Sequence, residues 1–151
     1  RLLAFNDLFV GARSHVSARY AIAVGGRPEA QSSSGVLIAT GAGSTGWLSS
    51  MFAMARGLAA FAGGSVGAPP PLALDDPRLA YVVREPFVSK SSHATVVAGL
   101  LAPGGALTIE SHMPEGGVIF SDGVERDALA FPSGARVTIA AAAQRTHLVV
   151  A

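Results

Sequence analysis

The sequence contains no cysteine. This excludes disulfides, cysteine-ligated metals and thiol nucleophiles, and it fits a reducing compartment, so we expect a cytoplasmic protein. Three of the histidines, His93, His112 and His147, are isolated and lack the spacing of metal ligands. The sequence therefore predicts no metal bound by this chain's own side chains.

Charge is also scarce. The 11 basic and 10 acidic residues nearly cancel, and no block of Lys and Arg could line a nucleic-acid groove or a phospholipid surface. The most apolar stretch, 47–68, is interrupted by Arg56, serines and glycines and falls short of a membrane span, so it predicts a buried helix. We expect neither nucleic acid nor membrane as a partner.

The length of 151 residues and the 50% apolar composition suit one sizeable core. The sequence predicts a single domain over residues 1–151, or half of a larger two-domain protein. Arg1 is not a natural start, and we expect a further segment upstream of it.

Only one stretch has helical periodicity. In residues 44–62, apolar side chains recur at spacings of three and four, and Ser44 or Thr45 can cap the start. A Gly- and Pro-rich connection follows over 63–76. The remaining chain predicts short strands at 2–10, 19–24, 36–40, 79–84, 94–101, 106–111, 118–120, 128–131, 135–141 and 146–150. This pattern indicates a mostly β chain with one main helix (α+β), arranged as an antiparallel layered β-sandwich.

The segment Gly41-Ala-Gly-Ser-Thr-Gly46 has the G-x-G-x-x-G spacing of a dinucleotide fingerprint. A Rossmann unit also needs alternating helices and strands, and an acidic residue about twenty positions later. No carboxylate occurs over 63–71, and only one helix is predicted. The pattern therefore does not indicate a Rossmann fold.

The same segment lies one residue away from the G-x-S-x-G nucleophile elbow. Ser44 is followed by acids and then by His147, which is the chain order of α/β-hydrolases. That fold needs a mostly parallel sheet with several helices, which this sequence does not predict. A serine hydrolase remains an alternative, and it requires that Ser44→Ala abolish ester hydrolysis.

Four motifs occur in a distinctive order: Asn6-Asp7-Leu-Phe-Val-Gly11, Ser32-Ser-Ser-Gly-Val-Leu-Ile-Ala-Thr40, Gly43-Ser-Thr-Gly-Trp47 and Ser121-Asp-Gly123. In order and spacing, across nearly the whole chain, they resemble the C-terminal domain of the NAD kinase family. That family has an Asn-Glu pair, an S-D-G strand leading into T-P-T-G-S-T-A-Y and a helix, and then antiparallel strands with a D-G hairpin.

The resemblance implies phosphorylation of the adenosine-ribose 2′-hydroxyl of NAD by ATP, or by polyphosphate, with Mg²⁺ accompanying the phosphate donor. It also implies an N-terminal α/β lobe with a G-G-D-G motif, and this motif is absent from the chain. The candidate catalytic base would lie in that missing lobe, so we expect this chain alone to bind and not to catalyse.

Asn6 and Asp7 match the Asn-Glu pair, for which the resemblance implies contact with the dinucleotide. A carboxylate accepts hydrogen bonds from ribose hydroxyls, and an amide can donate to and accept from an adenine edge. Asp7 is one methylene shorter than Glu. An Asn-Asp turn is the structural alternative.

Thr45, Gly46, Trp47 and Ser50 match T-A-Y and the following serine, so the resemblance implies base contacts there. Glycines let a backbone approach a flat ligand, a helix start offers free N–H groups, and an aromatic ring can stack on a base. A core anchor is the alternative for Trp47. Further candidates in the same motifs are Gly43, Ser44 and Asp122, although Asp122-Gly123 is also a typical hairpin turn.

The sequence departs from the family pattern in three places. Gly41-Ala42 replaces Pro-Thr, Gly46 replaces Ala, and Ser34 replaces the aspartate before Gly35. The loss of this carboxylate leaves open another hydroxyl acceptor, such as a lipid or a sugar. Arg13, His15 and Arg19 could meet phosphate, but a solvated loop is the simpler interpretation.

The resemblance further implies a homo-oligomer, in which a neighbouring subunit completes the dinucleotide site, and an exposed sheet edge would favour such pairing. The rival from another class is a non-catalytic nucleotide-binding or oligomerisation module that retained the pocket.

Overall fold

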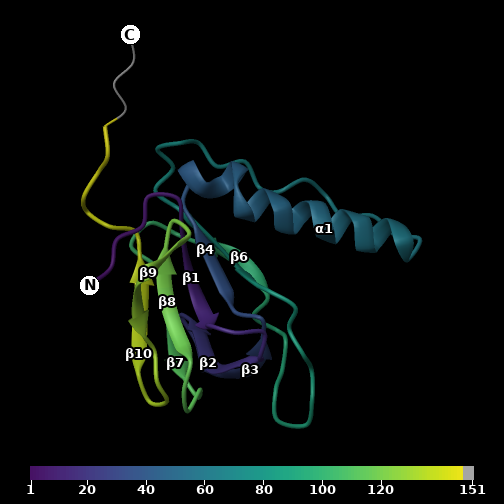
Figure 1. The fold of residues 1–151 in the computed structure, drawn as a ribbon. Helices are drawn as coiled ribbons and strands as arrows, with labels where there is room; N and C mark the ends of the chain where they lie inside the picture. Colours follow the sequence, from purple (N-terminus) through teal and green to yellow (C-terminus); the bar gives the residue numbers. More distant parts are fainter. Residues whose placement is uncertain (148–151) are drawn as a thin grey trace.

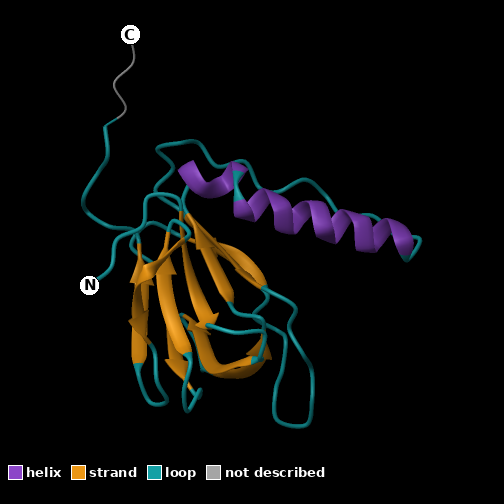
Figure 2. Ribbon diagram, in the orientation of Figure 1, coloured by secondary structure: helices purple, strands orange, loops and turns teal. Residues whose placement is uncertain are grey.

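The computed structural model describes residues 1–147 and contains, in that range, two antiparallel sheets and one long helix. Figure 1 shows the helix reaching out from one end of the strands, and Figure 2 shows the division between strands and helix. The strands are β1 Asp7–Ala12, β2 Ala18–Val24, β3 Glu29–Ser33, β4 Val36–Ala39, β5 Leu79–Val83, β6 Ala98–Leu101, β7 Ala106–Ser111, β8 Gly117–Ser121, β9 Val124–Ala130 and β10 Arg136–Ala140. The helices are the 3₁₀ turn η1 Ala42–Thr45 and the α-helix α1 Trp47–Phe61.

The larger sheet has the strand order β6-β5-β4-β1-β8-β9, and the smaller sheet has the order β10-β7-β2-β3. Every strand pair is antiparallel. In the middle of the larger sheet, Phe9 of β1 lies opposite Leu37 of β4 on one side and Phe120 of β8 on the other. The prediction of a mostly β chain with one main helix and antiparallel sheets is confirmed.

The main core contains residues from both sheets. Val10, Ile38 and Ile119 of the larger sheet belong to one buried cluster with Tyr20 and Ile109 of the smaller sheet. Because side chains alternate along a strand, their neighbours Phe9, Leu37 and Phe120 point to the opposite, outer face of the larger sheet. That outer face carries the start of α1 and the candidate site.

The helix differs from its prediction at both ends. Gly46 is its N-cap residue and no side chain caps it, because the Ser44 hydroxyl instead donates to the carbonyl oxygen of Gly41. The expected buried helix is also wrong for the second half: Leu48 and Met51 are buried, whereas Leu58 and Phe61 are exposed. A 3.6-residue period identifies an apolar face, but not whether another element covers it.

The strand predictions fail mainly where polar residues form strands. The strand β3 was not predicted because its sequence Glu-Ala-Gln-Ser-Ser is polar, and β9 begins earlier than the predicted 128–131. The predicted strand at 2–10 begins only at Asp7. The predicted strand at 146–150 falls largely on residues 148–151, outside the described residues, and residues 146 and 147 are not in a strand.

Buried polar groups explain β3. The hydroxyl of Tyr20, fully buried, lies 2.6 Å from the Ser33 Oγ and donates to the Gln31 Oε1 at 3.2 Å. Burial, the largest contribution, raises the pKa of Tyr20 to about 12. A polar strand is therefore accommodated in the core because its inward side chains have hydrogen-bond partners.

Candidate functional site

Three aromatic rings form a cluster on the outer face of the larger sheet. Phe9 stacks on Trp47, the first residue of α1, with ring centroids 5.5 Å apart and an interplanar angle of 15°. Phe9 also packs at 5.0 Å against Phe120 of β8. The ring of Trp47 is thereby fixed over the sheet while part of it stays accessible.

Two glycines make room for the ring of Phe9. A Cβ at Gly11 or at Gly35 would overlap this ring, and Gly35 also has a φ of +109°, which other residues rarely adopt. Glycine at these positions thus leaves space for an aromatic ring between β1 and the β3–β4 turn. The position of Phe9 in turn supports Trp47.

A cleft of about 470 Å³ opens beside this aromatic cluster. Its volume lies within the ordinary range of small-molecule sites. Its walls include Phe9, Trp47 and Phe120, the β1–β2 loop residues 13–17, Ser34, Arg84 and the acidic residues Glu85 and Glu125. The cleft therefore combines a flat apolar surface with charged groups of both signs.

A smaller cavity of about 130 Å³ adjoins the cleft. It shares Trp47, Arg84 and Glu85 with the cleft and adds Ser50, Met51 and Met54 from α1. Of the predicted site residues, Ser34 and Trp47 therefore line the cleft beside the aromatic cluster, and Ser50 lines the smaller cavity.

The predicted pair Asn6-Asp7 lies against the loop that leads into α1. The backbone N–H of Thr40 donates to the carbonyl oxygen of Asn6 at 2.9 Å. The Thr40 hydroxyl donates to the carbonyl oxygen of Phe5 at 2.7 Å and accepts from the backbone N–H of Gly43 at 3.2 Å. A Cβ at Gly43 would overlap the backbone of Asn6. Glycine at position 43 thus lets two segments of this chain approach each other, next to the predicted residues Ser44, Thr45 and Gly46 at the start of α1.

Asp122 holds the same end of the sheet. Its carboxylate accepts hydrogen bonds from the backbone N–H groups of three consecutive residues. These are Phe5, Asn6 and Asp7, at 2.9, 2.7 and 3.2 Å. Asp122 and Gly123 have φ values of 52° and 72° in the tight turn between β8 and β9. Asp122 therefore positions Asn6 and Asp7 in addition to forming a hairpin.

Asp7 is a buried carboxylate that faces the side of the sheet on which Phe9 lies. Within residues 1–147 no group donates a hydrogen bond to its side chain. Burial, and secondarily the nearby charge of Asp122, raise the pKa of Asp7 above its ordinary value of 3.8. The ionised form of the Asp7 carboxyl is disfavoured in the folded chain, and such shifted pKa values are common among residues of binding and active sites.

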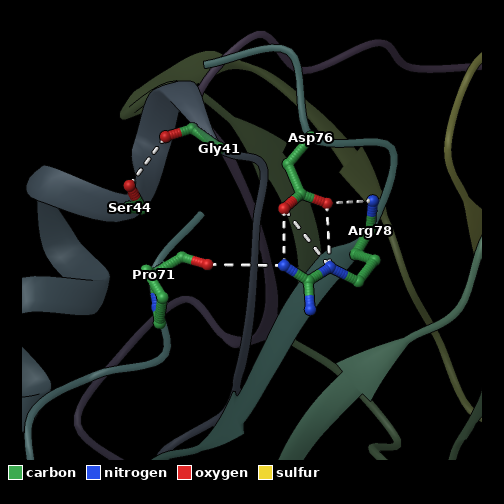
Figure 3. A network of polar contacts seen from close by, with 5 residues as sticks. All are labelled: Gly41, Ser44, Pro71, Asp76 and Arg78. Atoms are coloured by element: carbon green, nitrogen blue, oxygen red, sulfur yellow. Dashed lines mark hydrogen bonds and ion pairs between the residues drawn. The ribbon is translucent and has the colours of Figure 1, made fainter. Parts of the chain in front are cut away.

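The connection between α1 and β5 fastens the loop from its other side. As Figure 3 shows, the guanidinium of Arg78 faces the carboxylate of Asp76 and the carbonyl of Pro71. Hydrogen bonds from the guanidinium and the backbone N–H of Arg78, together with its charge, lower the pKa of Asp76 to about 2. A Cβ at Gly41 would overlap the carbonyl of Ala73, so this connection packs directly on the loop.

The structure thus divides the predicted residues into two groups. Asn6, Asp7, Asp122 and the loop 43–46 are linked at one end of β1 and β4, whereas Ser34, Trp47 and Ser50 line the cleft and its neighbour. The motifs did not identify Phe9, Phe120 or Arg84 as site residues. Their only sequence signal is an aromatic or basic residue in or at the end of a predicted strand.

Two kinds of feature are absent from residues 1–147. No cluster of three or more His, Asp and Glu side chains there could hold a metal ion. In the same range, no helix has both the length and the apolarity to cross a membrane.

The arrangement of these elements matches solved structures. An NAD kinase from Archaeoglobus fulgidus, solved in complex with ATP, superposes on 94% of this chain with a TM-score of 0.59 and 19% identity. The chain has the NAD kinase fold. Yeast NADH kinase, complexed with NADH, matches 88% of the chain with a TM-score of 0.55 and 17% identity.

The chain spans about half or less of the kinases that share this NAD kinase fold: 47% of the archaeal chain and 33% of the yeast chain. By sequence alone, no protein-family model and no curated protein matches it. The likeness is therefore carried by the fold and not by overall sequence identity.

Proposed function

We propose that this chain is the strand-rich, substrate-binding lobe of a kinase that phosphorylates the adenosine-ribose 2′-hydroxyl of NAD with ATP, or with polyphosphate. The observation that carries the proposal is the match of 94% of the chain to an NAD kinase, with a cleft of about 470 Å³ beside Trp47. The two similar kinases were solved with ATP and with NADH, which supports nucleotides as ligands.

In this proposal the lobe contributes positioning. Phosphoryl transfer needs the acceptor hydroxyl in line with the terminal phosphate, and a rigid binding surface supplies much of that order before reaction. Asp7 accepts hydrogen bonds from ribose hydroxyls, the Asn6 amide binds the adenine edge, and the start of α1 with Trp47 offers free N–H groups and a stacking surface.

A second lobe completes this proposed enzyme. The coverage of 47% and 33% of the similar kinases leaves room for an α/β lobe that supplies the catalytic base and binds the phosphates. Residues 1–147 offer no cluster of three metal-ligating side chains, so the Mg²⁺ that accompanies ATP is assigned to the nucleotide phosphates and the other lobe. This chain alone is then a binding lobe without activity.

The decisive variant is Asp7→Asn in the protein that carries both lobes. With NAD and ATP, we expect kcat/KM for NADP formation to fall by about 10- to 100-fold, since hydrogen bonds to a charged group contribute about 1.5–3 kcal/mol. The variant should be more stable than the wild type at neutral pH. Because folding raises the pKa of Asp7, the wild type loses free energy of unfolding as the pH rises from about 3.8 through the higher pKa of the folded chain. The asparagine variant should therefore have a higher Tm at pH 7 and gain nothing at pH 3.

Asp127→Asn is the matched control, because Asp127 is exposed on β9 and within residues 1–147 it pairs only with exposed Arg126. It should leave both Tm and NADP formation unchanged. Assays with a lipid, a sugar and NADH as acceptors separate the alternatives. If nucleotide binds but no acceptor is phosphorylated, the chain belongs to a non-catalytic binding module, and if no nucleotide binds, the proposal fails.

We also propose that the lobe forms a homo-oligomer through α1. Trp47, Met51, Met54, Leu58 and Phe61 follow the alternating four- and three-residue spacing of a helix-pairing seam, and Met54, Leu58 and Phe61 are 47, 61 and 92% exposed. Light scattering should show an oligomeric wild type and a monomeric Leu58→Glu variant. Ala60→Glu, on the other side of the helix, should remain oligomeric. A monomeric wild type would rule the proposal out.

A further inference from the structure

Two arginines are partly buried, and their environments differ. Arg78 has its guanidinium paired with Asp76 at 2.6 Å. Arg84, at the end of β5, has no such partner: within residues 1–147 no acid lies within ion-pair distance and no group accepts a hydrogen bond from its side chain. A partly buried guanidinium normally has an anion beside it.

Aromatic rings hold this guanidinium in place. The Cζ atom of Arg84 lies 5.2 Å from the ring centroid of Trp47 and 5.9 Å from that of Phe9. The two rings are 5.5 Å apart, so the three groups form a nearly equilateral triangle. Trp47 also packs against the buried cluster that includes Leu48 and Met51, and the rest of its ring stays accessible.

The backbone of Arg84 is fixed on the β3–β4 turn. Its N–H donates to the carbonyl oxygen of Gly35 at 2.8 Å, and its carbonyl accepts from the N–H of Ser34 at 2.9 Å. The next residue, Glu85, has a φ of 49°, which is uncommon for a residue with a side chain. Residues in such conformations cluster at ligand sites, because the surrounding structure must enforce them.

The position of Arg84 lets it act on both cavities. It lines the cleft of about 470 Å³ and the adjoining cavity of about 130 Å³. The wall of the cleft also includes Arg13 and His15 from the β1–β2 loop, together with the exposed Glu85 and Glu125. Neither glutamate forms an ion pair with Arg84, so the charge of Arg84 is available to a ligand.

We propose that Arg84 is the anion-recognition residue of this cleft: it binds a phosphate group of a nucleotide while the base packs against the accessible part of the Trp47 ring. A planar guanidinium suits phosphate because it can donate two parallel hydrogen bonds, and the rings beneath it keep it oriented. The inference rests on the proposed nucleotide-binding function, and it adds a residue that the sequence motifs did not identify.

The test compares ADP with adenosine, which share a base and differ in phosphate. Trp47 is the sole tryptophan of the chain, so quenching of its fluorescence reports binding at the cleft directly. For the wild-type chain we expect ADP to bind at least about tenfold more tightly than adenosine. Arg84→Met keeps an unbranched apolar stem on the rings but removes the charge. It should bring the two affinities to within about twofold and leave adenosine binding unchanged.

Arg136→Met is the matched control, because Arg136 is an exposed arginine paired with Glu110 on the other sheet, and it should retain the wild-type preference. Arg84→Lys should retain part of it. The inference is overturned if the wild type binds ADP and adenosine equally, if neither ligand quenches Trp47, or if Arg84→Met keeps the full preference for ADP. Equal binding of the two ligands, or an unchanged preference in Arg84→Met, overturns this inference alone. Absence of NADP formation with nucleotide still bound overturns the kinase function alone, so the two failures are distinguishable.

Discussion

Gly43→Ala is expected to lower the free energy of unfolding by about 3 kcal/mol or more. A methyl group at this position would overlap the backbone carbonyl of Asn6, and neither backbone can move freely. Asn6 is held by Asp122, and Thr40 bonds Asn6 through its backbone N–H and Gly43 through its hydroxyl. Overpacking of this kind costs about 1–3 kcal/mol where the surroundings can relax, and more where they cannot. Urea denaturation measures the change.

The control variant is expected to raise the free energy of unfolding instead of lowering it. Gly57 lies inside α1, where an added Cβ would meet no atom within 4 Å, so Gly57→Ala should raise stability by about 0.5–1 kcal/mol. In the Gly43 variant, the loop to α1 should separate from Asn6 and Asp7, and nucleotide binding should weaken along with stability. If both glycine variants were as stable as the wild type or more so, the contact between the loop and Asn6 would be wrong.

Phe9→Ala is expected to cost about 3–5 kcal/mol, the range for removing a buried aromatic ring. Phe9 is 5% exposed, and its ring fills the space that Gly11 and Gly35 leave open, so the neighbouring backbone cannot close the resulting cavity. The variant also loses the stacking of Trp47 at 5.5 Å. We expect a lower denaturation midpoint together with a shifted Trp47 fluorescence maximum, as the indole becomes more exposed to water.

Phe61→Ala serves as the comparison. Phe61 is 92% exposed at the end of α1, and its removal should change the stability of the monomer by less than about 0.5 kcal/mol, with no effect on Trp47. Equal losses in the two phenylalanine variants would mean that the aromatic cluster does not stabilise the larger sheet as described.

The prediction of strands worked where one face of a strand is apolar. In β1, Val10 and Leu8 pack in the main core while Phe9 packs outside, which is the alternation that the sequence displays. It failed for β3, because the inward residues Gln31 and Ser33 are polar and are stabilised by Tyr20, a residue on another strand. Hydropathy cannot anticipate a hydrogen bond that depends on pairing between strands.

The helix shows the same limit for surfaces. Periodicity located α1 closely, but it predicted burial for a helix whose second half is exposed at Leu58 and Phe61. An apolar face is a property of the segment itself, whereas its burial depends on what the rest of the fold places against it.

The candidate site could be located only in part from the motifs. They marked Trp47 and Ser34, which line the cleft, and Asp7, whose pKa is raised by burial. They did not mark Arg84, because a basic residue at the end of a strand has no motif. Arg84 lies 5.2 Å from the ring of Trp47, a residue of α1 that comes close to β5 only in the folded chain.

The sequence by itself determined the class of the chain: alternating apolar residues, turn residues at short intervals and one stretch of helical period dictate antiparallel sheets with one helix, since these are local properties of the backbone and side chains. Only the tertiary structure decided which glycines serve packing, as Gly43 does against Asn6, and that Arg84 is partly buried beside Phe9 and Trp47 with no acid paired to it among residues 1–147. The reason is physical: close approach, burial and charge pairing depend on distances between segments far apart in the chain, and these distances exist only once the sheets have formed.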